Sequence, residues 1–169
     1  MTDDLTTWTR DLPSPIGTIR LVASDEALVR VVLPGERGAP PEPHEAPEHP
    51  VLLRAVVELD AWFAGALRTF TVPLRATGTP FQHRVWDVLA TIPYGATWSY
   101  ADVAERIGQP RAVRAVGAAN GRNPLPIIVP CHRVIGRSGA LTGFGGGLPA
   151  KVWLLELERR ASGASLAFG

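Results

Sequence analysis

Cys131 and His132 are adjacent side chains that could together carry out nucleophilic chemistry. Cys131 is the only cysteine among the 169 residues. A thiol has a pKa of about 8.5, so it attacks a substrate at neutral pH only when a nearby base or positive charge favours the thiolate. His132 is the candidate base, acting directly or through a water molecule. A single cysteine is more often a small buried hydrophobic residue, so the pair alone does not establish catalysis.

The segment before the cysteine predicts a buried strand. Ile127, Ile128 and Val129 form an apolar run. Pro130 ends it, because proline has no N–H group for a sheet ladder. We therefore expect the thiol at the end of a rigid strand.

The residues around this pair extend the pattern well beyond one dipeptide. Residues 123–134 read NPLPIIVPCHRV, residues 111–117 precede them, and residues 143–148 and 153–158 follow. This ordered set closely resembles the signature of the O6-alkylguanine-DNA alkyltransferases, the methylated-DNA–protein-cysteine methyltransferases that repair DNA. The similarity is clear over roughly residues 79–160 and holds in outline for the N-terminal part. A bare Pro-Cys-His-Arg would be only suggestive.

The resemblance implies a single in-line displacement. Sulfur attacks the alkyl carbon on O6 of guanine, guanine leaves, and the alkyl-cysteine is not regenerated, so each molecule acts once. O4-alkylthymine is a second candidate lesion. The target base must be flipped out of the duplex, at a cost of about a few kcal/mol. The expected partner is double-stranded DNA with alkylated guanine, the expected state is a monomer, and no cofactor or metal is expected.

The resemblance also implies roles for catalytic residues. Cys131 matches the nucleophile, and His132 matches the base that activates it through a bound water. Glu158 matches the carboxylate that orients this histidine, as in a catalytic triad. Asn123 matches the asparagine that braces the turn beside the active site. Without the resemblance, Glu158 reads as a surface glutamate paired with a nearby arginine.

A second group of residues matches positions that contact DNA or the flipped base. Tyr100 matches the tyrosine that crowds the 3′ phosphate of the target nucleotide and points its hydroxyl at guanine N3. Arg114 matches the arginine that fills the gap left by the base. The two otherwise read as a half-buried aromatic residue and a solvent-facing residue. The positions that match the base pocket are Pro126, Val134, Phe144 and Gly145. Phe144 stands where many relatives carry tyrosine, so one pocket hydroxyl is absent.

Two other functions compete with alkyl transfer. A non-enzymatic sensor of alkylated bases, like the alkyltransferase-like proteins, is one, although those proteins lack the cysteine. A cysteine hydrolase with a Cys-His-Glu triad is the other. A mass change on Cys131 separates the transferase from the sensor, and turnover of an acyl substrate indicates the hydrolase.

Composition and charge are consistent with a globular protein that meets nucleic acid. Hydrophobic residues make up 46% of the chain and charged residues 20%, which supports a packed core. The single cysteine and the acidic N-terminus, which has no apolar signal segment, predict a cytoplasmic protein. Residues 1–78 carry 7 arginines and 11 acidic residues, a net of −4, whereas residues 79–169 carry 10 basic and 5 acidic residues, a net of +5. The half with the cysteine is therefore the basic half, although +5 alone also fits an ordinary solvated surface.

The chain predicts two small domains of an α+β fold. For residues 1–78 the resemblance implies a small ribonuclease-H-like sheet plus a helix. The patterns predict strands within 7–33 with a hairpin turn at 24–26, a loop or linker at 34–50, a helix at 51–64 capped by Gly65, and a short strand at 69–74. His44 and His49 fall in the predicted loop and are expected to be solvated rather than metal ligands.

Residues 79–169 are predicted to be mostly helical. Thr79 with Gln82 and Ser99 with Asp102 form capping boxes, which begin helices at 80–91 and 100–107. A third helix at 111–120 follows Gly108–Pro110, which predicts a helix-turn-helix. Its small residues permit close packing on a neighbouring helix or, in the resembled family, entry into the DNA minor groove, with Ala115, Gly117 and Ala118 as the contacts. We expect a glycine-rich pocket wall at 143–147, a last helix from Pro149 and a frayed tail at 161–169. The apolar face expected for that helix comprises Val152, Trp153, Leu155 and Leu157.

Overall fold

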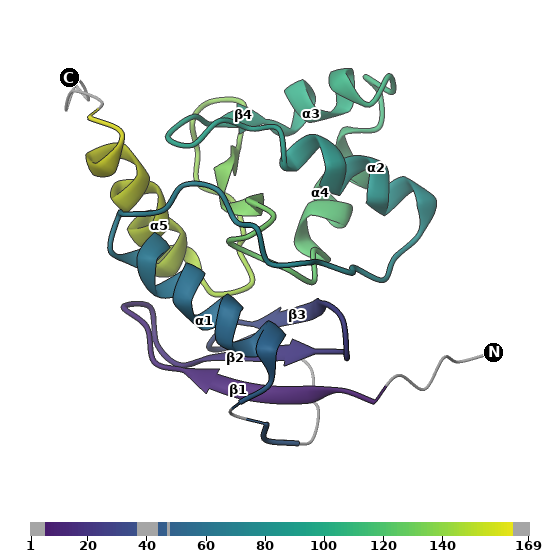
Figure 1. The fold of residues 1–169 in the computed structure, drawn as a ribbon. Helices are drawn as coiled ribbons and strands as arrows, with labels where there is room; N and C mark the ends of the chain where they lie inside the picture. The colour runs from purple at the N-terminus through teal and green to yellow at the C-terminus, as the bar shows by residue number, and fades with distance from the viewer. Residues whose placement is uncertain (1–5, 37–43, 47, 164–169) are drawn as a thin grey trace. The chain divides into compact units, whose positions relative to one another are not determined.

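The computed structural model describes residues 6–36, 44–46 and 48–163 (Figure 1). The chain divides into two compact units, Met1–Thr77 and Gly78–Gly169. No helix in the described part of the chain is long and apolar enough to cross a membrane. Small sheets and helices occur in both units, which confirms the α+β fold class.

The first unit is built on a three-stranded antiparallel sheet in the order β1-β2-β3. Its strands are β1 (Trp8–Leu12), β2 (Ile19–Ala23) and β3 (Leu28–Val32). The β2–β3 pair confirms the hairpin predicted around residues 24–26. There Ser24 N donates to Ala27 O, and Ala27 N donates to the Ser24 hydroxyl. In β2 every residue except Arg20 is buried, and in β3 Leu28 and Val31 are buried, so the sheet carries apolar side chains that a helix can cover.

Helix α1 (Pro50–Phe63) covers this sheet and contacts all three strands (Figure 1). Three side chains of α1 itself are fully buried: Leu52, Leu59 and Trp62. The helix confirms the prediction for 51–64, and Gly65 follows its last turn with a positive φ of 75°, which glycine adopts without strain. His49 is not merely a solvated loop residue, because its Nδ1 accepts the backbone N–H of Val51 at 3.2 Å and so caps the helix. Much of the predicted 34–50 loop lies outside the described residues.

The strand predicted at 69–74 is wrong. This segment is irregular, and Leu74 makes only an isolated bridge with Leu28. The reason is a buried carboxylate on α1: Glu58 accepts the backbone N–H groups of both Thr71 and Val72. Those donors are therefore taken from any sheet ladder, and Pro73 has none to offer.

The second unit contains three helices that pack against one another. These are α2 (Pro80–Leu89), α3 (Tyr100–Arg106) and α4 (Val113–Gly121). Both predicted capping boxes are present, at Thr79 for α2 and at Ser99 for α3. Gly108, at a φ of 77°, ends the turn after α3. Helices α3 and α4 with this turn confirm the predicted helix-turn-helix. Helix α4 starts two residues later than predicted, because Ala112 still hydrogen-bonds back to Gln109 in a turn.

The rest of the unit carries the cysteine. A short 3-10 helix, η1 (Cys131–Arg133), leads into β5 (Val134–Ile135), which pairs in parallel with β4 (Trp98–Ser99). Residues 136–139 form a turn that a hydrogen bond from Gly139 N to Gly136 O closes. Helix α5 (Leu148–Ala161) follows and contacts η1. Residues 164–169 of the predicted tail lie outside the described part.

The buried face of α5 differs from the apolar face predicted for it. Ala150, Lys151, Leu154 and Glu158 are buried, whereas Val152 is 42% exposed and Trp153, Leu155 and Leu157 are half-buried. The spacing of the buried set is that of one helical face. Lys151 and Glu158 are charged residues on this buried face, and both have hydrogen-bond partners in the interior.

Candidate active site

The segment before Cys131 is a tight loop, and the strand predicted at 127–129 is wrong. Ile127 has a φ of 73°, which is left-handed and unusual for a β-branched residue. Val129 N donates to Leu125 O at 2.9 Å, and Pro126 forms an isolated bridge with Val129. The loop therefore doubles back on itself. Ile127 is only 1% exposed, so burial of its side chain offsets the backbone strain.

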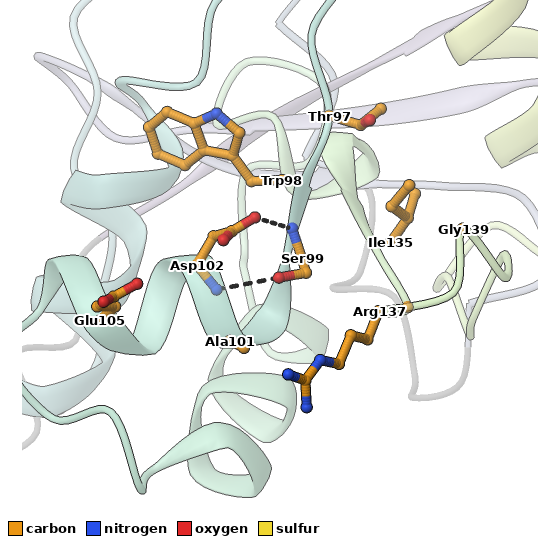
Figure 2. A pocket seen from close by; sticks show the side chains of 10 residues that line it. Thr97, Trp98, Ser99, Ala101, Asp102, Glu105, Ile135, Arg137 and Gly139 are labelled. Atoms are coloured by element: carbon orange, nitrogen blue, oxygen red, sulfur yellow. Dashed lines mark hydrogen bonds between the residues drawn. The ribbon is translucent and has the colours of Figure 1, made fainter.

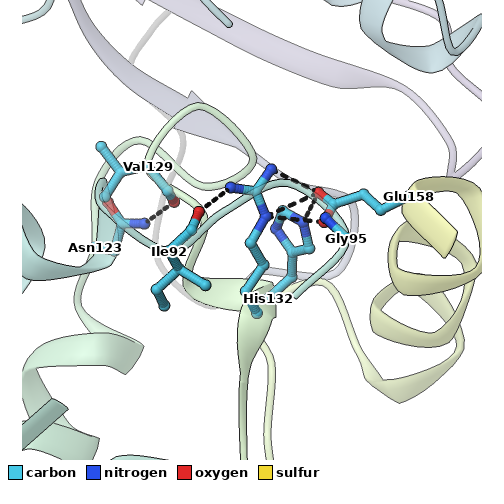
Figure 3. Close-up of polar contacts among 7 residues, drawn as sticks. Ile92, Gly95, Asn123, Val129, His132 and Glu158 are labelled. Carbon is cyan, nitrogen blue, oxygen red and sulfur yellow. Dashed lines mark hydrogen bonds and ion pairs between the residues drawn. The ribbon is translucent and has the colours of Figure 1, made fainter. Parts of the chain in front are cut away.

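Asn123 holds this loop closed. Its Nδ2 donates to Val129 O at 2.8 Å (Figure 3). Its Oδ1 accepts the backbone N–H of Leu125 at 3.0 Å. Val129 O also accepts the backbone N–H of Cys131 at 2.8 Å. One buried amide thus connects both ends of the loop to the turn that carries the thiol. This geometry fits the bracing that the resemblance implies for Asn123, whose role in the reaction stays a prediction.

Cys131 begins the 3-10 helix, and His132 is its next residue. Cys131 is 5% exposed and His132 is fully buried. His132 Nε2 lies 2.6 Å from Glu158 Oε2 on α5, a pair that is sealed from solvent because Glu158 is 1% exposed (Figure 3). The structure therefore brings together Cys131, His132 and Glu158, which the sequence places 27 residues apart at most. The carboxylate fixes the orientation of the imidazole next to the thiol.

Arg133 completes this cluster, and sequence reasoning assigned it no role. Its Nε donates to Glu158 Oε1 at 2.8 Å and its Nη2 to Oε2 at 2.9 Å, while Nη1 donates to Ile92 O at 2.7 Å. Gly95 N also donates to Glu158 Oε1. Glu158 is thus the partner of both the histidine and an arginine. The alternative interpretation of Glu158 was right about the arginine but wrong about the surface, because Glu158 is buried.

The burial of the cluster sets its charge states. Although burial alone raises the pKa of Glu158, the hydrogen bonds and charges of His132 and Arg133 outweigh it and lower the pKa to about 2. Burial lowers the pKa of His132 below its ordinary value, and the Glu158 carboxylate opposes this only in part. We therefore take His132 as neutral at neutral pH, which leaves it able to accept a proton.

Lys151 is a second buried residue that the sequence analysis missed. Its side chain is fully buried, and its Nζ donates to Val134 O at 2.6 Å and to Thr142 O at 3.1 Å. Burial lowers the pKa of Lys151, and the nearby Cys131 thiolate acts in the opposite direction. The lysine lies one turn before Leu154 and two turns before Glu158 on the same face of α5. That spacing was the only sequence signal for it.

Tyr100 is held between two elements. It is the first residue of α3, and a Cβ added to Gly117 of α4 would lie 3.8 Å from its ring. Its hydroxyl lies 2.6 Å from Thr142 Oγ1, in the loop before Phe144. Thr142 was not among the predicted site residues.

The outer face of α4 carries the residues predicted to meet DNA. Arg114, Ala115 and Ala118 are exposed, whereas Val116 and Ala119 are buried. Trp86 Nε1 donates to Ala119 O at 2.9 Å and fixes the buried side of α4 to α2. The small residues at 115 and 118 therefore lie on the surface rather than in the helix packing that the sequence alone favoured, although Gly117 does contact Tyr100.

The predicted pocket residues lie around η1 and the loop before α5. Pro126 and Val134 are buried, Phe144 is half-buried and Gly145 is exposed. A separate pocket of about 480 Å³ lies beside the start of α3 and is lined by Trp98, Ser99, Asp102, Ile135 and Arg137 among others (Figure 2). It includes none of the residues predicted to hold the base. Asp102 is already occupied there, because it accepts the backbone N–H of Ser99 in the capping box (Figure 2).

Two family models match this chain. Residues 80–160 match "6-O-methylguanine DNA methyltransferase, DNA binding domain", and residues 10–76 match "6-O-methylguanine DNA methyltransferase, ribonuclease-like domain". Together they span the folded parts of both units.

Several similar proteins are named methylated-DNA–protein-cysteine methyltransferase. A methylated-DNA–protein-cysteine methyltransferase of Mycobacterium leprae is 50% identical over 89% of this chain and 91% of its own length. A constitutive one of Bacillus subtilis is 46% identical over 86% and 92%. Among solved structures, Mycobacterium tuberculosis O6-methylguanine methyltransferase superposes with a TM-score of 0.85 at 48% identity, covering 95% and 98% of the two chains. A crystal structure of Mycobacterium tuberculosis OGT in complex with DNA gives a TM-score of 0.82 at 48% identity, covering 92% and 93%.

Proposed function

The chain belongs to the 6-O-methylguanine DNA methyltransferase family, and from that membership we propose that it repairs DNA by accepting the alkyl group of O6-alkylguanine on Cys131. The observation that carries the proposal is the buried arrangement at the start of η1. Cys131, the only cysteine of the chain, begins η1, and the next residue is a fully buried histidine that a carboxylate orients. Nothing about a purely structural cysteine requires that set of neighbours.

His132 is the proposed base. It accepts the thiol proton through a water molecule, and the thiolate sulfur forms a bond to the alkyl carbon as the carbon–O6 bond breaks. The electron pair of that bond goes to guanine, which then takes up a proton. Glu158 stabilises the imidazolium that forms. Lys151 contributes a positive charge near the sulfur, which favours the thiolate by the same interaction that opposes the lowering of the lysine's pKa.

DNA with an alkylated guanine is the proposed substrate, bound by α3 and α4 of the second unit. The crystal structure of a 48% identical relative with DNA supports DNA as the partner. The exposed small residues Ala115 and Ala118 permit close approach, and Arg114 replaces the flipped base in the stack. The proposed base pocket consists of Tyr100, Pro126, Val134, Phe144 and Gly145. Action as a monomer in the cytoplasm belongs to the same proposal.

The two rival functions are less well supported. A sensor of alkylated bases has no need of Cys131 or of its oriented histidine. A hydrolase would use the same three side chains, but it must release its product and regenerate the thiol. Both rivals are separated from the proposal by the fate of the sulfur.

Intact mass spectrometry after mixing with a duplex that holds one O6-methylguanine tests the proposal. We expect one CH2 to be added per protein, mapped to the peptide with Cys131, and no addition from the unmethylated duplex. Cys131→Ser should show no transfer while its affinity for DNA stays, because binding uses α3 and α4. An unchanged mass for the wild-type protein, or transfer to the serine variant at a comparable rate, would overturn the assignment.

A further inference from the structure

The side chain of Thr142 contacts the Tyr100 hydroxyl, and this contact has no role in the reaction proposed above. Its Oγ1 lies 2.6 Å from the Tyr100 hydroxyl, across the space between the start of α3 and the loop before Phe144. Both residues are half-buried. The residue pair is 42 positions apart in the chain, so the contact depends on the fold rather than on local sequence.

The backbone on both sides of this contact is held in place. On the Tyr100 side, Ser99 and Asp102 form the capping box of α3, and the ring lies against Gly117. On the Thr142 side, the carbonyl oxygen of Thr142 accepts from the buried Lys151 ammonium at 3.1 Å. The same ammonium binds Val134 O at 2.6 Å. The two hydroxyl groups therefore meet because each is attached to a fixed segment.

A tyrosine hydroxyl has one proton, and this limits what the contact can be during the reaction. If the Tyr100 hydroxyl donates its one hydrogen bond to the leaving guanine, its oxygen can only accept a hydrogen bond from Thr142. The threonine hydroxyl must then be the donor. A hydroxyl that accepts one hydrogen bond becomes a better donor in the next, because chained hydrogen bonds polarise one another.

We propose that Thr142 is a positioning residue for alkyl transfer, which orients the Tyr100 hydroxyl and directs its proton toward the leaving base. The inference rests on the proposed function, and specifically on Tyr100 as the donor to guanine. Thr142 itself touches no reacting atom. Its effect on the rate therefore passes through Tyr100.

A double-mutant cycle measures that dependence. Thr142→Val removes the hydroxyl at nearly constant volume, Thr142→Ser keeps it, and Tyr100→Phe removes the partner. Single-turnover rates on one O6-methylguanine duplex should fall roughly tenfold for Tyr100→Phe, as one lost donor in the transition state implies, and roughly threefold for Thr142→Val. Thr142→Ser should keep most of the rate. In the Tyr100→Phe background, Thr142→Val should cause no further loss.

Two outcomes of the double-mutant cycle would overturn the inference. A threefold loss from Thr142→Val that persists in the Tyr100→Phe background would show that threonine acts through packing, and would overturn the inference. Equal rates for wild type and Tyr100→Phe, with the mass gain on Cys131 intact, would remove Tyr100 as a donor and the inference with it, while leaving the proposed function standing. Ser138→Ala, which loses an exposed hydroxyl in the preceding turn, is the matched control and should match the wild-type rate.

Discussion

Glu158→Gln should destabilise the protein by about 3 kcal/mol at pH 7. The pKa of Glu158 falls from 4.5 to about 2 in the folded protein, and a shift of this size corresponds to about 3 kcal/mol. Removing one partner of a buried ion pair costs about 3–5 kcal/mol, because the other charge stays buried. Here that charge is Arg133, which donates to both carboxylate oxygens. The two routes give the same order of magnitude.

The pH dependence follows from the direction of the shift. A carboxyl group with a lowered pKa in the folded state contributes stability above its unfolded pKa, and loses it as the pH falls toward the folded pKa. The Glu158 contribution is therefore complete above about pH 5, and about 1 kcal/mol of it remains at pH 3. The gap between wild type and Glu158→Gln should shrink accordingly. The buried His132 adds its own acid sensitivity, so the gap rather than the wild-type curve is the quantity to follow.

Urea denaturation from pH 3 to pH 7 provides the measurement. Glu156→Gln is the matched control, because it removes a carboxylate from the same helix. The partner of that carboxylate is the half-buried Arg159, and we expect this partly exposed pair to contribute at most about 1 kcal/mol. A gap of less than about 1 kcal/mol at pH 7, or one that stays constant down to pH 3, would refute the buried ion pair as a source of stability. The gap for Glu156→Gln should be small throughout.

Two further predictions concern DNA and the buried lysine. Arg114→Ala should weaken binding to a duplex with a flipped base more than binding to single-stranded DNA, which has no base stack to refill. Titrations of both DNA forms at several salt concentrations measure this difference. Binding that does not change with salt would argue against phosphate contacts. Lys151→Met leaves Val134 O and Thr142 O without their donor, so it should cost about 2 kcal/mol of stability and slow alkyl transfer, whereas Arg160→Met on the exposed side of α5 should change neither.

Local signals predicted much of the second unit. The capping boxes at Thr79 and Ser99 were readable because each involves residues three positions apart, so no tertiary contact is needed to form them. The turn at Gly108 was readable for the same reason. Cys131, His132, Glu158 and Asn123 were identified through the family resemblance, and the structure places them in one connected cluster. Their roles in the reaction stay predictions until the variants are measured.

The wrong predictions have a common cause in hydrogen-bond partners that the apolar pattern of a segment does not show. Apolar β-branched residues at 127–129 favour a strand, but Asn123 and the doubled-back loop hold Ile127 at a positive φ. The segment at 69–74 favours a strand, but Glu58 takes its N–H groups. Lys151 was missed, and Glu158 without the resemblance read as a surface glutamate, because charged residues are rarely buried without partners. The partners of both residues come from other parts of the chain.

The burial of Cys131 decides which electrophiles can reach it. At 5% exposure Cys131 is largely closed to molecules in solution, whereas in the proposed reaction a base turned out of a duplex reaches the sulfur through the pocket. For a protein that uses its reactive atom once, this closure governs its working lifetime, because every collision with an oxidant or a foreign alkylating agent that ends in reaction removes one competent molecule. The low exposure of Cys131 therefore slows the side reactions that inactivate the protein, so that a larger fraction is still unreacted when it meets damaged DNA.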